Sequence, residues 1–147
     1  MTLYRPKVYT ASKLSHAEMW KALHDDSAWN HVTWTARWPF MAHLESGSEY
    51  PPSYFDFQHF WNIDITDVTR SDFVLLWGEE TSETPLRGAL VEAGAAIASG
   101  KTVLAINLSL RHTWSHHRLV ARLDTLEEAR QLLLRYYSSP IERVIRS

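Results

Sequence analysis

The chain has 147 residues, of which 45% are hydrophobic and 22% are charged, and its formal net charge is -2. These values predict one folded domain over residues 1–147 and exclude an intrinsically disordered chain, and the acidic balance argues against binding of a nucleic acid polymer. The sequence has no cysteine, so disulfides and thiolate metal sites are excluded, which suits a reducing compartment. Because no apolar run is long enough to cross a bilayer and the first residues lack the apolar core of a signal peptide, we expect a cytoplasmic protein that binds no membrane.

The first part of the chain predicts a strand, a helix and a second strand. Residues 7–10 are a short β-rich run, and residues 31–38 alternate between apolar and polar side chains, as a half-buried strand does. Between them, residues 11–26 carry apolar side chains at helical spacing. Ser15, with Glu18 three residues later, predicts a capping box at the start of this helix.

The middle of the chain predicts a loop and a long helix. Residues 39–53 are rich in glycine, proline and serine, which favours a loop. Residues 54–69 show a helical pattern, and its predicted inward face carries Phe57, Phe60, Trp61, Asp64 and Val68. A carboxylate therefore lies on the apolar side of this helix.

Two apolar runs predict the centre of a sheet. Residues 73–77 and 102–107 are almost entirely apolar, which is typical of strands buried on both faces. Between these strands, residues 78–85 predict a loop and residues 88–99 predict a helix of small and apolar side chains. Gly100 is the candidate C-terminal cap of that helix.

The last part of the chain continues the alternation. Residues 108–118 predict a loop, residues 119–123 an edge strand, and residues 124–137 an amphipathic helix that begins with a capping box of Thr125 and Glu128. The pattern as a whole predicts an α/β protein: a single flavodoxin-like or Rossmann-like three-layer sandwich with a mostly parallel five-stranded sheet. Ligands of such sheets bind outside the carboxyl ends of the strands, so the loops after these strands are where we expect the site.

Glu92 is the first candidate for chemistry, because it is the single charge in the helix predicted over residues 88–99. A carboxylate among small and apolar neighbours must be paired, hydrogen-bonded or neutralised. The alternative is a solvent-facing glutamate. That alternative predicts polar side chains on the same helix face, three, four and seven residues later. Those positions are Ala95, Ala96 and Ser99, which supply almost no polar groups.

Further candidates follow the strands or lie near them. Asp64 shares a helix face with Phe60 and Trp61, and Asp67 lies about one turn further; a salt bridge to Arg37 or Arg87 is the structural alternative for Asp64. Tyr9 and Ser12 end the first strand in a hydroxyl-rich turn, which can hold a ligand oxygen or simply cap a helix. Trp34, Trp38, Phe40 and Trp61 can stack on a flat ligand or pack in the core.

The loop over residues 108–118 carries a cluster of histidines. His112 and His116 have the spacing of a helical metal pair, but no glutamate follows in the pattern of a zinc protease and the segment predicts a loop. We therefore expect no metal and no cofactor. His112, Ser115 and His116 are instead candidates for contacts to a ligand.

Three segments together resemble the nucleoside 2-deoxyribosyltransferase family and the related nucleoside-monophosphate N-glycosidases. They are VYTAS, WNIDITDVTRSDFVLLW and RGALVEAGAAIASGKTVLAI, and they span Lys7 to Asn107. The resemblance implies that Glu92 is the nucleophile that attacks the anomeric carbon of the sugar. It implies that Tyr9 orients Glu92, that Asp64 binds the sugar hydroxyls, and that the loop over residues 108–118 reaches the site of a neighbouring subunit.

The chain departs from this pattern at Leu86, where the transferases commonly carry an aspartate that handles the base. The related hydrolases also lack that aspartate, and Arg87 can pair with a 5′-phosphate. Gly88 and the alanines after it leave room for a sugar and for a packed partner.

The resemblance implies cleavage of the N-glycosidic bond of a deoxynucleoside and transfer of the deoxyribosyl group to another nucleobase. Hydrolysis of nucleoside 5′-monophosphates and non-catalytic binding of a nucleotide are the alternatives. The expected partners are a nucleoside or nucleotide, a nucleobase, and a second copy of the chain in a homodimer or higher even oligomer with shared sites.

Overall fold

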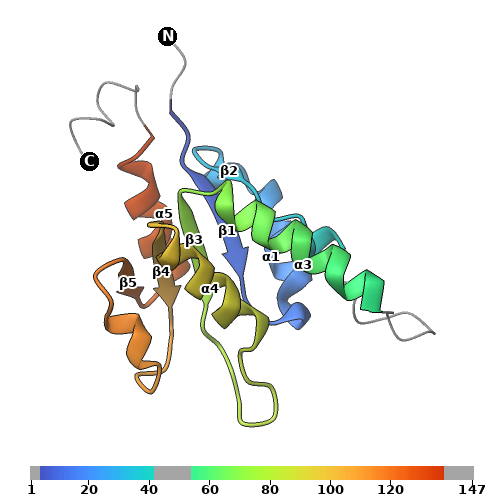
Figure 1. Ribbon diagram of the computed structural model, residues 1–147. Coiled ribbons are helices and arrows are strands. Elements are labelled where there is room, and N and C mark those ends of the chain that lie inside the picture. The colour runs from blue at the N-terminus through green and yellow to red at the C-terminus, as the bar shows by residue number, and fades with distance from the viewer. Residues whose placement is uncertain (1–3, 42–53, 138–147) are drawn as a thin grey trace.

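The computed structural model describes residues 4–41 and 54–137, which form an open parallel sheet with helices on both sides (Figure 1). The strand order is β2-β1-β3-β4-β5, and every neighbouring pair is parallel. The strands are β1 (Lys7–Ala11), β2 (Thr33–Trp34), β3 (Phe73–Trp77), β4 (Thr102–Ile106) and β5 (Val120–Leu123). The predicted α/β class and five-stranded sheet are confirmed, and the sheet is parallel throughout.

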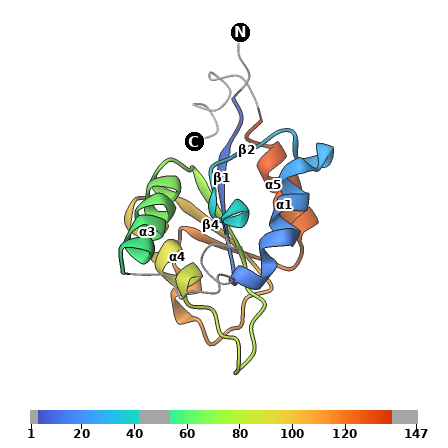
Figure 2. The same ribbon diagram turned by 90° about the vertical axis from the view of Figure 1, so that its right-hand side faces the viewer.

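Two helices cover each face of the sheet, so the sheet and the two helical layers form a three-layer sandwich. The helices α1 and α5 lie on one face, and α3 and α4 lie side by side on the other (Figure 2). Their bounds are α1 (Ala17–Asp25), α3 (Tyr54–Thr69), α4 (Gly88–Ala98) and α5 (Leu126–Leu134). Short 3₁₀ turns connect them: η1 (Leu14–His16), η2 (Ser27–Trp29), η3 (Trp38–Phe40) and η4 (Thr113–His116).

The core lies where sequence predicts it, around the two central apolar strands. The side chains from Val74 to Leu76 on β3 and from Val103 to Ile106 on β4 are all buried. Parallel strands covered by helices on both faces need apolar side chains at every position, which explains the unbroken runs. The chain order 2-1-3-4-5 places the switch in direction between β1 and β3, so a ligand site is expected at the carboxyl ends of these two strands.

The second strand is much shorter than the sequence predicts. We expect residues 31–38 to be extended, but only Thr33 and Trp34 pair with β1. The chain then turns into η3, whose first residues include Pro39. The indole N–H of Trp38 donates to the carbonyl of Thr10 at 2.6 Å, which draws this segment across the end of β1 instead of along it.

The helix ends are predicted correctly at some places and wrongly at others. Thr125 caps α5 and accepts from the Glu128 amide at 3.1 Å, and Gly100 has a φ of 76° just after α4, as expected. The predicted cap at Ser15 is wrong, because η1 precedes α1 and His16 occupies the N-cap position.

The predicted inward face of α3 is correct in part. Phe60, Asp64 and Val68 are buried, whereas Phe57 and Trp61 are exposed by 48% and 38%. Most of the loop predicted over residues 39–53 lies outside the described residues. Within the described part of the chain, no helix combines the length and the hydropathy that a bilayer span requires.

Candidate functional site

A pocket of about 350 Å³ opens at the carboxyl ends of β1 and β3. It lies between the turn after β1, the inward side of α3 and the first two turns of α4. Its lining residues are Ser12, Lys13, Leu14, Ser15, Trp38, Trp61, Asp64, Thr84, Pro85, Arg87, Gly88 and Glu92. The pocket therefore contains six of the eleven residues that sequence assigns to a site, and a seventh, Tyr9, contacts Glu92 from beneath.

Glu92 lies in the second turn of α4 with only 5% of its surface exposed. Burial raises the pKa of its carboxyl well above the usual value. The hydroxyl of Tyr9 donates a hydrogen bond to Oε2. Oε1 accepts no hydrogen bond from residues 4–41 or 54–137, so one oxygen is held in place and the other is available at the pocket.

Tyr9 reaches Glu92 because α4 lies very close to the sheet. Tyr9 is completely buried on β1, in register with Val74 of β3. Ala89, Ala93 and Ala96 form the inner side of α4, and each is at most 1% exposed. Sequence analysis assigns some of these small residues to packing against another copy of the chain; instead they pack against the chain's own core, and this close packing brings the tyrosine and the carboxylate together.

A second carboxylate and an aromatic ring complete the α3 side of the pocket. Asp64 lines the pocket and is 9% exposed. Trp61 lies one turn earlier and covers Gly88, such that a Cβ added to Gly88 would lie 3.3 Å from the Trp61 ring and 4.0 Å from Glu92 Oε1. The missing side chain of Gly88 therefore keeps the space between the ring and Glu92 open.

Hydroxyl and cationic groups form the opposite rim. Lys13 and Arg87 line the pocket with Ser12, Ser15 and Thr84. The Ser12 hydroxyl accepts from the Trp20 indole at 2.7 Å, so it is held by the protein itself. Lys13 contacts Thr84 across the rim, with Nζ 3.4 Å from Oγ1. The two cations of this rim make it the positively charged part of the pocket lining.

The candidate stacking residues divide into two groups. Trp38 and Trp61 line the pocket. Trp34 does not line it and stacks on His24 with ring centroids 4.4 Å apart, and Phe40 packs against the same histidine. Trp34 is therefore a packing residue, which was the structural alternative, whereas Phe40 is 49% exposed and lies outside both the pocket and the core.

Asp67, a predicted ligand contact, does not line the pocket. It is 1% exposed, and its carboxylate accepts a bidentate contact from Arg37, whose Nη2 lies 2.7 Å from Oδ1. The salt bridge expected as an alternative for Asp64 is therefore made by Asp67. Asp67 lies one turn after Asp64 on α3, where it contacts the backbone amide and the side chain of Arg37, directly before η3, instead of lining the pocket.

The histidine loop also lies apart from the pocket in the single chain. His112 contacts Glu80, and the Ser115 hydroxyl donates to the His112 carbonyl at 2.7 Å while accepting from Arg122 at 2.6 Å. His116 is exposed. The structure thus assigns His112 and Ser115 to a network within the chain, and their predicted contact to a ligand of the same chain has no geometric support.

Sequence analysis does not single out Lys13, Thr84 or Glu80. The first two belong to loops that are expected to carry a site, but a lone lysine or threonine in a loop gives no signal of its own. Among the described residues there is no cluster of three or more histidine, cysteine, aspartate or glutamate side chains that could hold a metal ion.

Comparisons with known proteins support the fold of the chain. No family model and no curated protein matches the chain. Among solved structures, it is similar to a conserved protein from Enterococcus faecalis V583, with a TM-score of 0.60 and 14% identity, over 90% of this chain and 99% of that one. At this level of identity the similarity supports the α/β sandwich and carries no statement about activity.

Proposed function

We propose that the protein cleaves the N-glycosidic bond of a 2′-deoxynucleoside and transfers the deoxyribosyl group to another nucleobase. The observation that carries this proposal is the buried pair of Tyr9 and Glu92, whose second carboxylate oxygen is available at the pocket. A carboxylate fixed on one side and open on the other is the arrangement that a nucleophile needs for attack on an anomeric carbon.

The reaction has two displacements at the anomeric carbon. Glu92 Oε1 forms a bond to C1′ while the bond from C1′ to the base nitrogen breaks, and the base leaves with that electron pair and takes up a proton. A nitrogen of the second base then attacks C1′ and loses its proton. The ester bond between C1′ and Glu92 breaks at the same time, and its electron pair returns to the carboxylate. Two inversions retain the β configuration.

The other residues of the pocket have roles that fit their positions. Asp64 holds the sugar hydroxyls, because it is the second carboxylate in the pocket. Trp38 and Trp61 provide aromatic walls for the flat base. The volume of about 350 Å³ lies within the range of small-molecule sites.

The raised pKa of Glu92 predicts the pH dependence of the free enzyme. The nucleophile is the ionised form, and burial disfavours that form. The value of kcat/KM should therefore rise with pH through the raised pKa of Glu92 and then level off. The positive charge that develops on the sugar in the transition state favours the ionised carboxylate, which is how burial of this group assists the reaction.

A second candidate function is hydrolysis of nucleoside 5′-monophosphates, and the cationic rim favours it. Lys13 and Arg87 both line the pocket and can pair with a phosphate. Leu86 is buried, with 4% of its surface exposed, so its position supplies no acid to the base. In this reaction water attacks the glycosyl-enzyme in place of a second base.

Product analysis distinguishes these functions. The protein is incubated with a deoxynucleoside or its 5′-monophosphate, with and without a different free base. A new nucleoside supports transfer, and free base with sugar phosphate supports hydrolysis. Binding without turnover in both the wild type and Glu92→Ala indicates a non-catalytic nucleotide-binding protein.

Trapping tests the nucleophile directly. A 2-fluoro-arabinosyl nucleoside slows both displacements and more strongly the second, so a glycosyl-enzyme should accumulate and mass spectrometry of peptides should locate the sugar on Glu92. An adduct on another residue, or none with any base, contradicts the proposed mechanism.

We also propose that the protein acts in the cytoplasm as a homodimer or higher even oligomer. The neighbouring helices α3 and α4 expose Phe57, Trp61 and Val91, and Val91 is 55% exposed. Exposed apolar side chains grouped on two adjacent helices favour an interface. Sedimentation should give at least a dimer, and Val91→Glu should shift the population toward monomer, whereas a monomeric wild type contradicts shared sites.

A further inference from the structure

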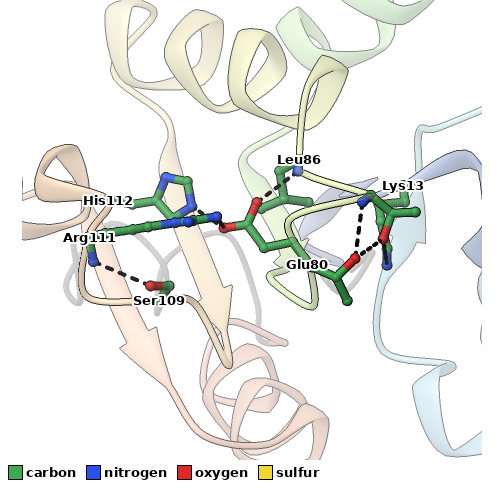
Figure 3. A network of polar contacts seen from close by, with 8 residues as sticks. Lys13, Glu80, Leu86, Ser109, Arg111 and His112 are labelled. Carbon is green, nitrogen blue, oxygen red and sulfur yellow. Dashed lines mark hydrogen bonds and ion pairs between the residues drawn. The ribbon is translucent and has the colours of Figure 1, made fainter.

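The segment between β3 and α4, residues 78–87, forms one wall of the pocket, and we refer to it as the strap. Thr84, Pro85 and Arg87 of the strap line the pocket, and the strap ends where α4 begins. The position of the strap therefore sets both the width of the pocket and the start of the helix that carries Glu92. Figure 3 shows the polar contacts that hold it.

Glu80 is the centre of these contacts. Its side chain is 6% exposed, and Oε2 accepts from the backbone amide of Leu86 at 2.8 Å. Oε1 contacts His112 Nε2 at 2.6 Å and Arg111 Nη2 at 2.9 Å. One carboxylate thus closes the strap on itself and fastens it to the loop between β4 and β5 (Figure 3).

The loop to which Glu80 is fastened is itself firmly held. Arg122 of β5 donates to the Leu108 carbonyl at 2.9 Å and to the Ser115 hydroxyl at 2.6 Å. Gly78 at the start of the strap packs against Leu108 so closely that an added Cβ would lie 2.7 Å from the Leu108 Cα. The β4–β5 loop therefore gives Glu80 a rigid support.

The far side of the strap has a weaker attachment. Thr81 and Thr84 close an inner turn, in which the Thr84 amide donates to the Thr81 hydroxyl at 3.0 Å. Lys13, which is half-buried, contacts the exposed Thr84 across the rim of the pocket, and the contact itself is exposed to solvent. Since this contact is long and solvent-exposed, the buried Glu80 contacts carry most of the restraint.

The ionisation of Glu80 agrees with this geometry. Burial by itself raises the pKa of the carboxyl. The hydrogen bonds from the Leu86 amide, His112 and Arg111 outweigh burial and lower the pKa to about 2. Glu80 is therefore ionised in the folded protein at neutral pH, and all three contacts are charge-assisted.

We propose that Glu80 is a positioning residue of the pocket: its buried carboxylate, bonded to the Leu86 amide, His112 and Arg111, fixes the strap so that Arg87 and Gly88 stand at the substrate. The kinetic consequence of this role rests on the proposed function. Its structural consequence, the restraint of the strap, is independent of any activity.

The experiment compares Glu80→Ala and Glu80→Gln with the control Glu127→Gln, in which an exposed carboxylate paired with Arg130 on α5 is changed. Hydrogen exchange of the full chain is followed at the Leu86 amide and at the amides of β3 and β4. In Glu80→Ala the Leu86 amide should exchange at least about tenfold faster, while β3 and β4 stay protected. Glu80→Gln, which keeps an acceptor for that amide, should restore part of the protection, and the control should match the wild type.

The kinetic arm uses the substrate that the wild type cleaves. Glu80→Ala should raise KM about tenfold or more with a smaller change in kcat, because the rim that binds substrate is loosened while Tyr9 and Glu92 remain paired. Unchanged Leu86 exchange, or faster exchange spread equally over β3 and β4, overturns the positioning role. A wild type without any turnover overturns the proposed function alone, since the exchange results are judged without it.

Discussion

Glu80 and Glu92 are both buried carboxylates, twelve positions apart, yet their environments are opposite. Glu80 has three donors, and its pKa is lowered to about 2. From the described residues Glu92 has one donor, the Tyr9 hydroxyl, and burial raises its pKa well above the usual value. The comparison indicates that burial alone does not decide the ionisation of a carboxyl, because hydrogen-bond donors and nearby positive charges can outweigh it. The three donors to Glu80 suit a residue that holds structure, and the oxygen of Glu92 that meets no donor from the described residues suits its proposed role as the nucleophile.

Substitution of Glu92 tests this contrast most strongly. Glu92→Gln should lower turnover by at least about 10³-fold, because the proposed nucleophile is lost. The same variant should be more stable than the wild type at pH 7 by about 1 kcal/mol or more, about 3 °C in Tm, since it removes the cost of burying a charge. Thermal unfolding and product assays measure both effects.

The pH dependence of the folding stability tests the direction of the pKa shift at Glu92. Its pKa is higher in the folded protein than in the unfolded chain, so the wild type loses stability as pH rises above about 4.5, the usual value, toward the folded pKa. Glu92→Gln should lack this loss, and the advantage of the variant should grow over that range. A variant that is less stable than the wild type at pH 7 contradicts a buried, costly charge at Glu92.

Removal of the Tyr9 hydroxyl, the donor to Glu92 in the described part of the chain, should have the next largest effect. Tyr9→Phe should lower kcat by about 10- to 100-fold, because the proposed nucleophile loses the group that orients it. The matched control is Tyr136→Phe, which changes a tyrosine that packs against Phe73 and does not line the pocket. Equal activities of the two variants, measured at saturating substrate, argue against an orienting role for Tyr9.

Glu80 should respond to pH in the opposite direction from Glu92. Its folded pKa of about 2 lies below the usual 4.5, so the stability it contributes is present above pH 4.5 and is lost as pH falls toward 2. Glu80→Gln should be less stable than the wild type by about 1–2 kcal/mol at neutral pH. Urea unfolding should show the two proteins converging in acid, and a constant difference between pH 7 and pH 2 rules out the charged contacts as its source.

The smallest effect is expected at the edge of the pocket. Gly88→Ala places a Cβ 3.3 Å from the Trp61 ring, so the ring must shift by a few tenths of an ångström and KM should change about two- to fivefold. Gly94→Ala is the matched control on the same helix, since nothing lies within 4 Å of its added Cβ. That control should raise stability by up to about 1 kcal/mol with KM unchanged. Equal KM values in the two variants contradict a role of the Trp61–Gly88 contact in binding.

Much of the fold follows from the sequence, because the alternation of strands and helices leaves few topologies for a parallel sheet. The continuous apolar runs of β3 and β4 identify the centre, and the carboxyl ends of the strands then bring Ser12, Trp38, Arg87 and Gly88 to one place. The short β2 is not predicted, because its end depends on a tertiary hydrogen bond from Trp38 to Thr10. Alternation of side chains carries no information about that bond.

The carboxylates of the site are predictable to different degrees. Glu92 is conspicuous because it is alone among small and apolar residues. Asp64 and Asp67 cannot be separated by spacing alone, since both lie near the inward side of α3, and only the tertiary position of Arg37 shows that Asp67 makes the bidentate ion pair. Glu80 is one of three glutamates in its loop, and nothing local indicates that it is the one that becomes buried.

The alanines on the inner side of α4 have a consequence for how this protein can change. The separation between helix and sheet is set by Ala89, Ala93 and Ala96, and the meeting of Tyr9 with Glu92 depends on that separation. A larger side chain such as valine at any of these positions acts as a spacer and moves the two groups apart without entering the pocket. Under the proposed function, these alanine positions outside the pocket are thus under the same constraint as Tyr9 and Glu92, and an activity lost by substitution there cannot be repaired by redesigning the pocket alone.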